Sequence, residues 1–145
     1  MKIYLDMCCY NRPYDPQDQL KIAMETQSKL KIQRMIIEGK IELIGSYVLD
    51  YECGNVPVPM RKNSIRDFIS NNMTGHVGVE RDKEVSEIAE RIMQTNIKQY
   101  DAYHIASAIY AGCTFFITTD IRLLKYKTEE IRLINPIDFI SEMEL

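Results

Sequence analysis

The sequence lacks the patterns that mark several classes of protein. Its four cysteines show no disulfide framework, and Cys8 and Cys9 are direct neighbours. No C-x-x-C or H-x-x-x-H spacing joins the cysteines to the two histidines, which argues against a zinc site. There is also no low-complexity tract, charge block or internal repeat. We therefore expect residues 1–145 to form a single domain whose thiols are reduced and mostly buried.

Long apolar runs are also absent. No apolar stretch approaches the roughly 20 residues that a membrane helix needs. Asp6 and Arg12 interrupt the amino-terminal apolar run, so no signal peptide is predicted. We expect a cytoplasmic protein with no membrane partner.

The chain has no excess of positive charge. Lysine and arginine number 18 against 21 aspartate and glutamate residues, for a net charge of −3. This balance argues against a protein that holds nucleic acid by bulk electrostatics. It does not exclude a nuclease, because acidic residues can gather at a metal site.

Short apolar runs alternate with longer segments of helical character. Strands are predicted at residues 2–5, 41–44, 115–118 and 132–134, and helices at about 17–38, 61–71, 85–93 and 100–111, with helical turns after Ser46, from Asp120 and from Pro136. Residues 11–16 contain two prolines and are expected to form a loop, while Gly39 and Gly112 are expected to end helices. The crossovers between strands are long enough for parallel pairing. The pattern therefore predicts an open α/β sheet with helices on both faces.

Four carboxylates lie at the margins of this predicted core. Asp6 and Asp120 follow two strands directly, Glu52 lies in the helix that leaves another strand, and Asp101 begins an apolar helix. Open α/β sheets bind ligands at the carboxyl ends of their strands. We expect all four side chains to converge on that edge of the sheet.

Convergent carboxylates need a positive charge. At an effective dielectric near 20, two like charges 4 Å apart repel by about 4 kcal/mol. Mg²⁺ or Mn²⁺ relieves this repulsion, because hard cations take oxygen ligands. A bound divalent metal lowers the pKa of its water and neutralises charge on a phosphodiester, while a carboxylate can act as base. The residues thus predict metal-dependent phosphodiester hydrolysis.

Each carboxylate also has a structural interpretation when taken alone. Asp6 would cap the following loop, Glu52 would lie on a solvated helix face, and Asp101 would be a helix-start charge. Asp120 would be the N-cap of the turn that follows it. The functional hypothesis therefore depends on their joint placement.

Two neighbours of the carboxylates have open roles. His104 lies three residues after Asp101 on nearly the same helical face, where it could touch substrate, hold Asp101 or simply pack. Thr118 and Thr119 could support Asp120 or hold a water, or be ordinary strand residues.

The motifs together resemble the PIN-domain family, which includes the VapC-type toxins of toxin–antitoxin pairs. They are Met-Lys-Ile-Tyr-Leu-Asp at the start, the segment from Ser46 to Glu52, Asp-Ala-Tyr-His-Ile-Ala from Asp101, and Phe-Ile-Thr-Thr-Asp ending at Asp120. The resemblance spans nearly the whole chain and implies a Rossmann-like three-layer α/β/α sandwich with a central parallel sheet.

The resemblance also implies a site and a substrate. Asp6, Glu52, Asp101 and Asp120 match an acidic quartet that binds Mg²⁺ or Mn²⁺ and cleaves RNA. Thr118 matches a small hydroxyl residue two positions before the last Asp, and Asn11 falls in the first active-site loop; these two and His104 are the expected substrate or supporting residues. Toxins of this kind usually pair with a small antitoxin and often form homodimers.

The chain departs from the family pattern at two places. Many PIN toxins have Thr or Ser just after the first Asp, where this chain has Met7 and Cys8. Some carry another acidic residue beside the last Asp, where this chain has Ile121. These departures bear on the binding of a second metal ion, whereas all four main carboxylates are present.

Two other readings of the sequence compete with the ribonuclease. A non-catalytic PIN-like module for RNA or protein contacts would be expected to lose a carboxylate, and none is lost. A response-regulator receiver would need a second acid where Met7 stands and a lysine directly after residues 115–118.

The basic residues also allow two interpretations. A small set of them could contact RNA phosphates, or could be ordinary surface charges: Arg12, Arg61, Lys62 and Arg66.

Overall fold

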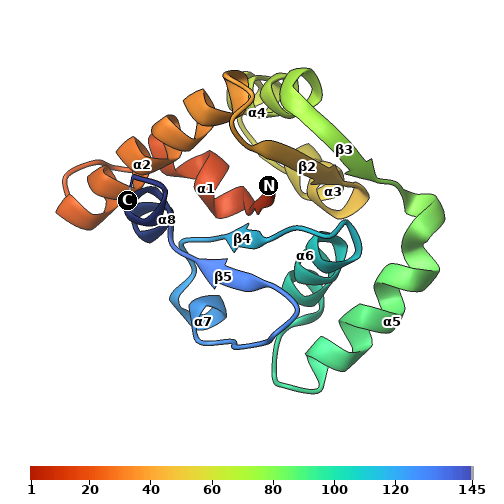
Figure 1. The fold of residues 1–145 in the computed structure, drawn as a ribbon. Helices are drawn as coiled ribbons and strands as arrows, with labels where there is room; N and C mark the ends of the chain where they lie inside the picture. The colour runs from red at the N-terminus through yellow and green to blue at the C-terminus, as the bar shows by residue number, and fades with distance from the viewer. Residues whose placement is uncertain (145) are drawn as a thin grey trace.

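Residues 1–144, which the computed structural model describes, form a five-stranded parallel sheet (Figure 1). Leu145, the last residue of the predicted domain, lies outside the described residues. The strands are β1 (Lys2–Leu5), β2 (Glu42–Ser46), β3 (Met73–Val77), β4 (Phe115–Ile117) and β5 (Arg132–Ile134). Their order is β3-β2-β1-β4-β5, and every pairing is parallel. The predicted open parallel α/β sheet is confirmed.

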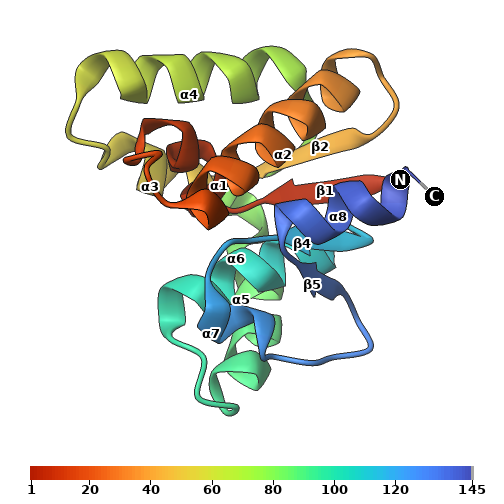
Figure 2. The same ribbon diagram turned by 90° about the vertical axis from the view of Figure 1, so that its left-hand side faces the viewer.

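Helices cover both faces of the sheet. Figure 2 shows α2 (Leu20–Ile37), α4 (Pro59–Asn72) and α8 (Pro136–Met143) over one face, and α5 (Asp82–Met93), α6 (Gln99–Tyr110) and α7 (Ile121–Leu124) over the other. Two short helices, α1 (Met7–Asn11) and α3 (Tyr47–Gly54), directly follow β1 and β2. The result is a three-layer α/β/α arrangement, as predicted.

The strand order reverses direction between β1 and β4. From β1 the chain moves outward through β2 to β3, and it then crosses back to β4 on the other side of β1. Leu5 pairs with Ile117, so the carboxyl ends of β1 and β4 lie side by side. The backbone N–H of Asp6 extends this pairing by donating to the carbonyl of Ile117 at 3.0 Å. Asp6 therefore stands at the topological switch point, where such sheets bind ligands.

Apolar burial holds the layers together. Ile3, Tyr4 and Leu5 of β1 are fully buried, as expected for a central strand covered on both faces. Ala102 and Ala106 of α6 are also fully buried, and their small side chains allow this helix to lie close to the sheet. This close packing carries Asp101, at the start of α6, toward the carboxyl edge.

Local signals set several helix ends. Gly39 and Gly112 follow α2 and α6 with φ of +74° and +78°, a left-handed conformation that glycine adopts without steric cost. The predicted helix stops at these residues are confirmed. The hydroxyl of Ser46 accepts a hydrogen bond from the N–H of Leu49 at 3.0 Å, which confirms Ser46 as the N-cap of α3.

Two segments differ from the prediction. Residues 73–77 form an edge strand, β3, although Gly75 and Gly78 were expected only to separate the helical segments on either side. Residues 11–14 are helical instead of a loop, because α1 ends at Asn11 and a 3-10 turn runs from Arg12 to Tyr14 around Pro13. Neither change moves the carboxyl edge of the sheet.

The lengths and apolar character of the helices bear on membranes. Among residues 1–144, no helix is both long enough and apolar enough to cross a bilayer.

Candidate functional site

Asp6 is a buried carboxylate at the end of β1. Its residue is 7% exposed, and one oxygen accepts the N–H of Met7 at 2.8 Å, so Asp6 is the N-cap of α1. The other oxygen accepts the hydroxyl of Thr118 at 2.9 Å and lies 3.4 Å from the thiol of Cys8. Burial raises the pKa of Asp6, and the nearby His104 and the Thr118 hydrogen bond only partly offset this. Such a carboxylate is stabilised in its charged form by an added cation.

Glu52 reaches the same place from α3. One of its oxygens lies 2.8 Å from Nε2 of His104, which is buried in α6. His104 therefore holds Glu52 rather than Asp101, which the sequence had offered as its partner. The candidate ligand atoms of Asp6, Glu52 and His104 all lie within 4.8 Å of one another.

Asp101 and Asp120 border this group. Burial raises the pKa of Asp101, and the charges of Asp6 and Asp120 raise it further, which places the three carboxylates within electrostatic reach of one another. Asp120 is the N-cap of α7 and accepts the backbone N–H of Arg122 at 2.9 Å. Burial acts to raise the pKa of Asp120, but hydrogen bonds from the Arg122 side chain and backbone outweigh it, so the pKa is lowered.

The donor set fits a divalent metal. Asp6 and Glu52 meet at the carboxyl edge, and the charges of Asp6 and Asp120 act on Asp101. Burial raises the pKa values of Asp6 and Asp101, and oxygen ligands suit Mg²⁺ or Mn²⁺. The carboxylates were expected to need an added positive charge. Asp120 already has one nearby, because Arg122 lies 3.3 Å from it in an exposed ion pair. Asp6 and Asp101, whose pKa values burial raises, keep the strongest need for a cation.

The other expected site residues, Thr118 and Asn11, differ in whether they contact the carboxylates. Thr118 is fully buried: its hydroxyl donates to the Asp6 carboxylate and accepts the backbone N–H of Asp120 at 3.1 Å. Asn11 is the last residue of α1, and its Oδ1 is buried without a hydrogen-bond partner. Among the described residues, no side-chain hydrogen bond ties Asn11 to the quartet, and its role stays a prediction.

Three residues at the site escaped the sequence reasoning. Cys8 lies 3.4 Å from both the Asp6 carboxylate and the Thr118 hydroxyl, and its position two residues after Asp6 was the available signal. Tyr4 bonds to Nδ1 of His104 at 2.7 Å and to the hydroxyl of Ser46 at 2.6 Å. Tyr4 lies in an apolar strand and Ser46 in a cap position, so no local pattern marked either contact.

An aromatic cavity of ≈ 620 Å³ adjoins Glu52 and His104. The ring of Tyr100 stacks on His104 with centroids 5.7 Å apart, and Tyr51 lies beside Tyr100 at 6.1 Å. Tyr51 is 67% exposed despite its size. The lining residues include no charged side chain: Tyr47, Val48, Tyr51, Val79, Gln99, Tyr100 and Tyr103.

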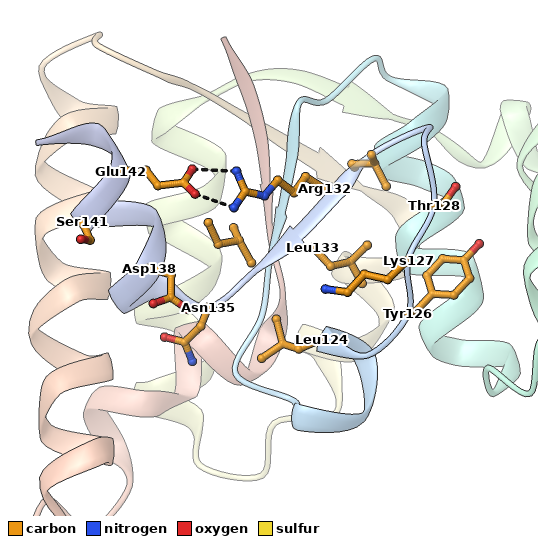
Figure 3. Close-up of a pocket in the computed structure, with 12 residues that line it drawn as sticks. Leu124, Tyr126, Lys127, Thr128, Arg132, Leu133, Asn135, Asp138, Ser141 and Glu142 are labelled. Carbon is orange, nitrogen blue, oxygen red and sulfur yellow. Dashed lines mark hydrogen bonds and ion pairs between the residues drawn. The ribbon is translucent and has the colours of Figure 1, made fainter. Parts of the chain in front are cut away.

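A second cavity, of ≈ 600 Å³, lies between β5, α8 and the segment after α7 (Figure 3). Arg132 and Glu142 face each other across it and form an ion pair, with Nη1 and Oε2 2.9 Å apart. None of the four carboxylates lines this cavity. Arg132 and Glu142 therefore satisfy each other, and the cavity is separate from the carboxylate site.

Two solved structures share this fold. VapBC2 from Rickettsia felis, bound to a DNA fragment from its promoter, matches with a TM-score of 0.60 and 14% identity over 93% of this chain and 98% of that chain. FitAcB from Neisseria gonorrhoeae matches with a TM-score of 0.54 and 17% identity over 92% of this chain and 97% of that chain. At these identities the similarity shows the fold alone. No curated protein matches the sequence.

The family comparison agrees with the fold and with the motifs from Asp101 and before Asp120. The sequence model of the PIN domain matches residues 20–129, well over half of the chain. The chain belongs to the PIN-domain family.

Proposed function

We propose that the protein is a metal-dependent endoribonuclease that hydrolyses RNA phosphodiester bonds. The observation that carries this proposal is the convergence of carboxylates at the switch point, where the ligand atoms of Asp6, Glu52 and His104 lie within 4.8 Å of one another. Burial and the charges of Asp6 and Asp120 raise the pKa of Asp101. A partly buried acidic cluster of this kind suits a hard divalent cation. Membership of the PIN-domain family supports a nuclease.

In this proposal Asp6, Glu52, Asp101 and Asp120 hold Mg²⁺ or Mn²⁺. The metal supplies charge neutralisation and a water of lowered pKa. Thr118 and Cys8 orient the Asp6 carboxylate, and Arg122 orients Asp120. One of the carboxylates accepts the proton of the attacking water.

RNA as the substrate is supported by the surface beside the carboxylates. Single-stranded RNA is commonly bound by stacking its bases on aromatic side chains, and Tyr51 and Tyr100 are exposed next to Glu52 and His104. Among the expected phosphate contacts, Arg12 is engaged elsewhere, in ion pairs of 2.9 Å with Glu25 and Asp15. Arg61, Lys62 and Arg66 remain candidates.

We further propose that the nuclease is the toxin of a type II toxin–antitoxin pair, acting on RNA in the cytoplasm. The fold shared with VapBC2 and FitAcB supports this role. The partners would be a small antitoxin protein and, as a homodimer, a second copy of the chain. A small reading frame next to this one would favour the toxin role over housekeeping RNA processing.

The test is RNA cleavage with Mg²⁺ or Mn²⁺ by wild type and by Asp101→Asn. We expect wild type to cleave and the variant to lose at least about 100-fold in rate, because even residues that only support metal ligands contribute 10–100-fold. Metal should also raise the melting temperature of wild type and not of the variant. Asp67→Asn, an exposed carboxylate of α4, is the control and should behave as wild type.

The alternative is a non-catalytic PIN-like module that binds RNA or protein. It predicts RNA binding without metal-dependent cleavage. The nuclease proposal fails if pure wild-type protein cleaves no RNA with either metal.

A further inference from the structure

A buried hydrogen-bond chain runs from Ser46 to Glu52. The hydroxyl of Ser46 lies 2.6 Å from that of Tyr4, which lies 2.7 Å from Nδ1 of His104, and Nε2 of His104 lies 2.8 Å from Glu52. Ser46 and Tyr4 are fully buried, so water cannot replace a missing partner there. Each donor in the chain must therefore find its acceptor within it.

Counting donors and acceptors gives the direction of the chain. Ser46 Oγ already accepts the N–H of Leu49 at 3.0 Å. If Tyr4 also donated to Ser46, the serine proton would be left buried without an acceptor, at a cost of about 1–3 kcal/mol. If Ser46 donates to Tyr4, then Tyr4 donates to Nδ1 of His104, and His104 donates from Nε2 to Glu52. In this second arrangement the protons of Ser46, Tyr4 and His104 Nε2 each have one acceptor.

From this order we infer that Tyr4 is a positioning residue that fixes His104 with its single proton on Nε2. His104 in turn presents that N–H to Glu52 and sets the direction of its carboxylate. This role deepens the proposed function and rests on it, because the oriented Glu52 is a proposed ligand of the catalytic metal.

The inference also decides between two roles for His104. Its nitrogen lies close enough to Asp6 and Glu52 to join a metal site. In the inferred order, however, Nδ1 accepts from Tyr4 and Nε2 carries a proton, so neither nitrogen has a free lone pair for a cation. His104 therefore stays outside the coordination sphere, and the metal binds to oxygen ligands alone.

The stacked ring of Tyr100 supports this assignment. It lies nearly parallel to His104, at 29°, on the side of the aromatic cavity. Tyr4 holds the same imidazole at its edge, with an interplanar angle of 66°. The imidazole plane is thus held by two rings and two hydrogen bonds, which suits a fixed donor.

The first test reads the tautomer directly, without RNA. Nitrogen-15 NMR of histidine-labelled wild-type protein distinguishes a protonated ring nitrogen from a bare one, and His76→Gln assigns the two histidines. We expect His104 to show a protonated Nε2 and a bare Nδ1, both before and after saturation with Mg²⁺. A proton on Nδ1 in wild type, or loss of the Nε2 proton when Mg²⁺ binds, would overturn the inference.

The second test uses Tyr4→Phe, which keeps the ring stacked on Phe116 and removes only the hydroxyl. We expect a mixture of His104 tautomers and a Mg²⁺ affinity about tenfold or more below wild type. The matched control is Tyr10→Phe, because the Tyr10 hydroxyl is buried and has no hydrogen-bond partner among residues 1–144. It should change neither the tautomer nor the affinity.

A double-mutant cycle separates positioning from a general structural effect. In a Glu52→Gln background, Tyr4→Phe should cause no further loss of Mg²⁺ affinity, since its effect passes through Glu52. An equal loss in both backgrounds, or an unchanged tautomer in Tyr4→Phe, overturns the inference. The wild-type spectrum decides the hydrogen-bond order even if Tyr4→Phe does not fold.

The two proposals can fail separately. If wild type cleaves RNA and Tyr4→Phe leaves the tautomer and the Mg²⁺ affinity unchanged, the nuclease stands and the positioning role falls. If no RNA is cleaved but the tautomer and affinity follow the expectation, the positioning role stands and the nuclease falls.

Discussion

At the level of single residues, Asp6 and Asp120 each combine a structural role with a proposed functional one. Each is the N-cap of a short helix, α1 or α7, and each faces the carboxylate site. A cap uses one carboxylate oxygen, as Asp6 does toward Met7 and Asp120 toward Arg122. The second oxygen of Asp6 accepts from Thr118 and that of Asp120 pairs with Arg122, and a carboxylate oxygen can take more than one partner. Capping and metal binding are thus compatible uses of one side chain, and the capping interpretation from sequence does not exclude the functional one.

Thr118 links the Asp6 carboxylate to the backbone N–H of Asp120, and its replacement is a sharp test. Thr118→Val keeps the shape but removes the donor to Asp6 and the acceptor of the Asp120 N–H. We expect a loss of about 1–3 kcal/mol in unfolding free energy, measured with urea, because buried polar groups are left unpaired. Mg²⁺ affinity should fall by roughly 10-fold or more. Thr118→Ser keeps the hydroxyl and should retain most of both quantities; equal losses in the two variants would contradict this role.

Lys29 offers a prediction about pH and stability. Its ammonium group is buried beside the Tyr10 and Phe68 rings, donates to Gln33 at 2.8 Å, and burial lowers its pKa from 10.5 to about 8. Below pH 8 both the folded and the unfolded chain hold this proton, and the cost of burying the charge is fully present. Between about pH 8 and 10.5 the unfolded state holds more protons, so this group makes stability rise with pH.

Lys29→Met should therefore stabilise the fold most at neutral pH. The shift corresponds to a gain on the order of 3 kcal/mol, and the advantage over wild type should shrink as pH rises from 8 toward 10.5. Urea unfolding of both proteins across this range measures the difference. Lys21→Met, on an exposed position of the same helix, is the control and should give a flat difference. A difference for Lys29→Met that is constant with pH would refute the assignment.

At the level of elements, a buried ionic cluster joins three segments. Glu25 of α2 is fully buried and accepts from Arg12 at 2.9 Å and from Asn135 at 2.6 Å. Arg12 belongs to the 3-10 turn after α1, and Asn135 is the N-cap of α8. One carboxylate thus ties the start of the chain and its last helix to α2.

Arg12→Met should destabilise the protein by about 3 kcal/mol or more, because it leaves the buried Glu25 charge without its cation. Urea denaturation measures the change. Arg91→Met is the matched control, because its pair with Glu130 has a similar length of 2.9 Å but lies in solvent. That variant should change stability little. If the two substitutions had equal effects, the cluster would not have the role assigned to it.

The elements that the sequence predicted well have strong local signals. Buried strands such as β1 and helices that end at Gly39 or Gly112 follow from apolar pattern and glycine geometry. The edge strand β3 does not, because its five residues include Gly75 and His76 and only Val77 is buried. Its conformation comes from pairing with β2, which the local sequence does not encode.

The candidate site likewise has features that local sequence predicts and features that depend on tertiary contacts. The strand ends placed Asp6 and Asp120 at one edge from sequence, because position along a strand is local information. The partners of the carboxylates were harder to predict: Glu52 meets His104 across 52 positions, and Thr118 meets Asp6 across 112. Such contacts depend on how helices lie on the sheet. Cys8 and Arg122 were nearer in sequence, yet a thiol or an exposed arginine is too common to mark a site.

At the level of the whole molecule, net charge and fold suggest a particular mode of RNA binding. The chain carries a net charge of −3, and its carboxylates gather at the switch point between β1 and β4. RNA would meet repulsion there unless a divalent cation lay between the carboxylates and the phosphates. Beside that point lies an uncharged aromatic cavity. Affinity should therefore come from the metal and from base stacking more than from many lysine or arginine contacts.

This mode predicts a shallow dependence of RNA affinity on salt. For single strands, log K changes with log salt by about −0.7 per phosphate contact, so three contacts from Arg61, Lys62 and Arg66 would give a slope of about −2. Titrations of a single-stranded RNA analogue that cannot be hydrolysed into wild-type protein with Mg²⁺ measure the slope from low to high KCl. Arg66→Gln should reduce the slope by about 0.7.

Tyr51→Ser should weaken binding roughly tenfold at every salt concentration and leave the slope unchanged, because stacking releases no counterions. A slope of log K against log salt of −5 or steeper, for protein with Arg66 and Tyr51 intact, would mean that RNA is held mainly by bulk electrostatics. That result would contradict what the net charge and the aromatic cavity predict.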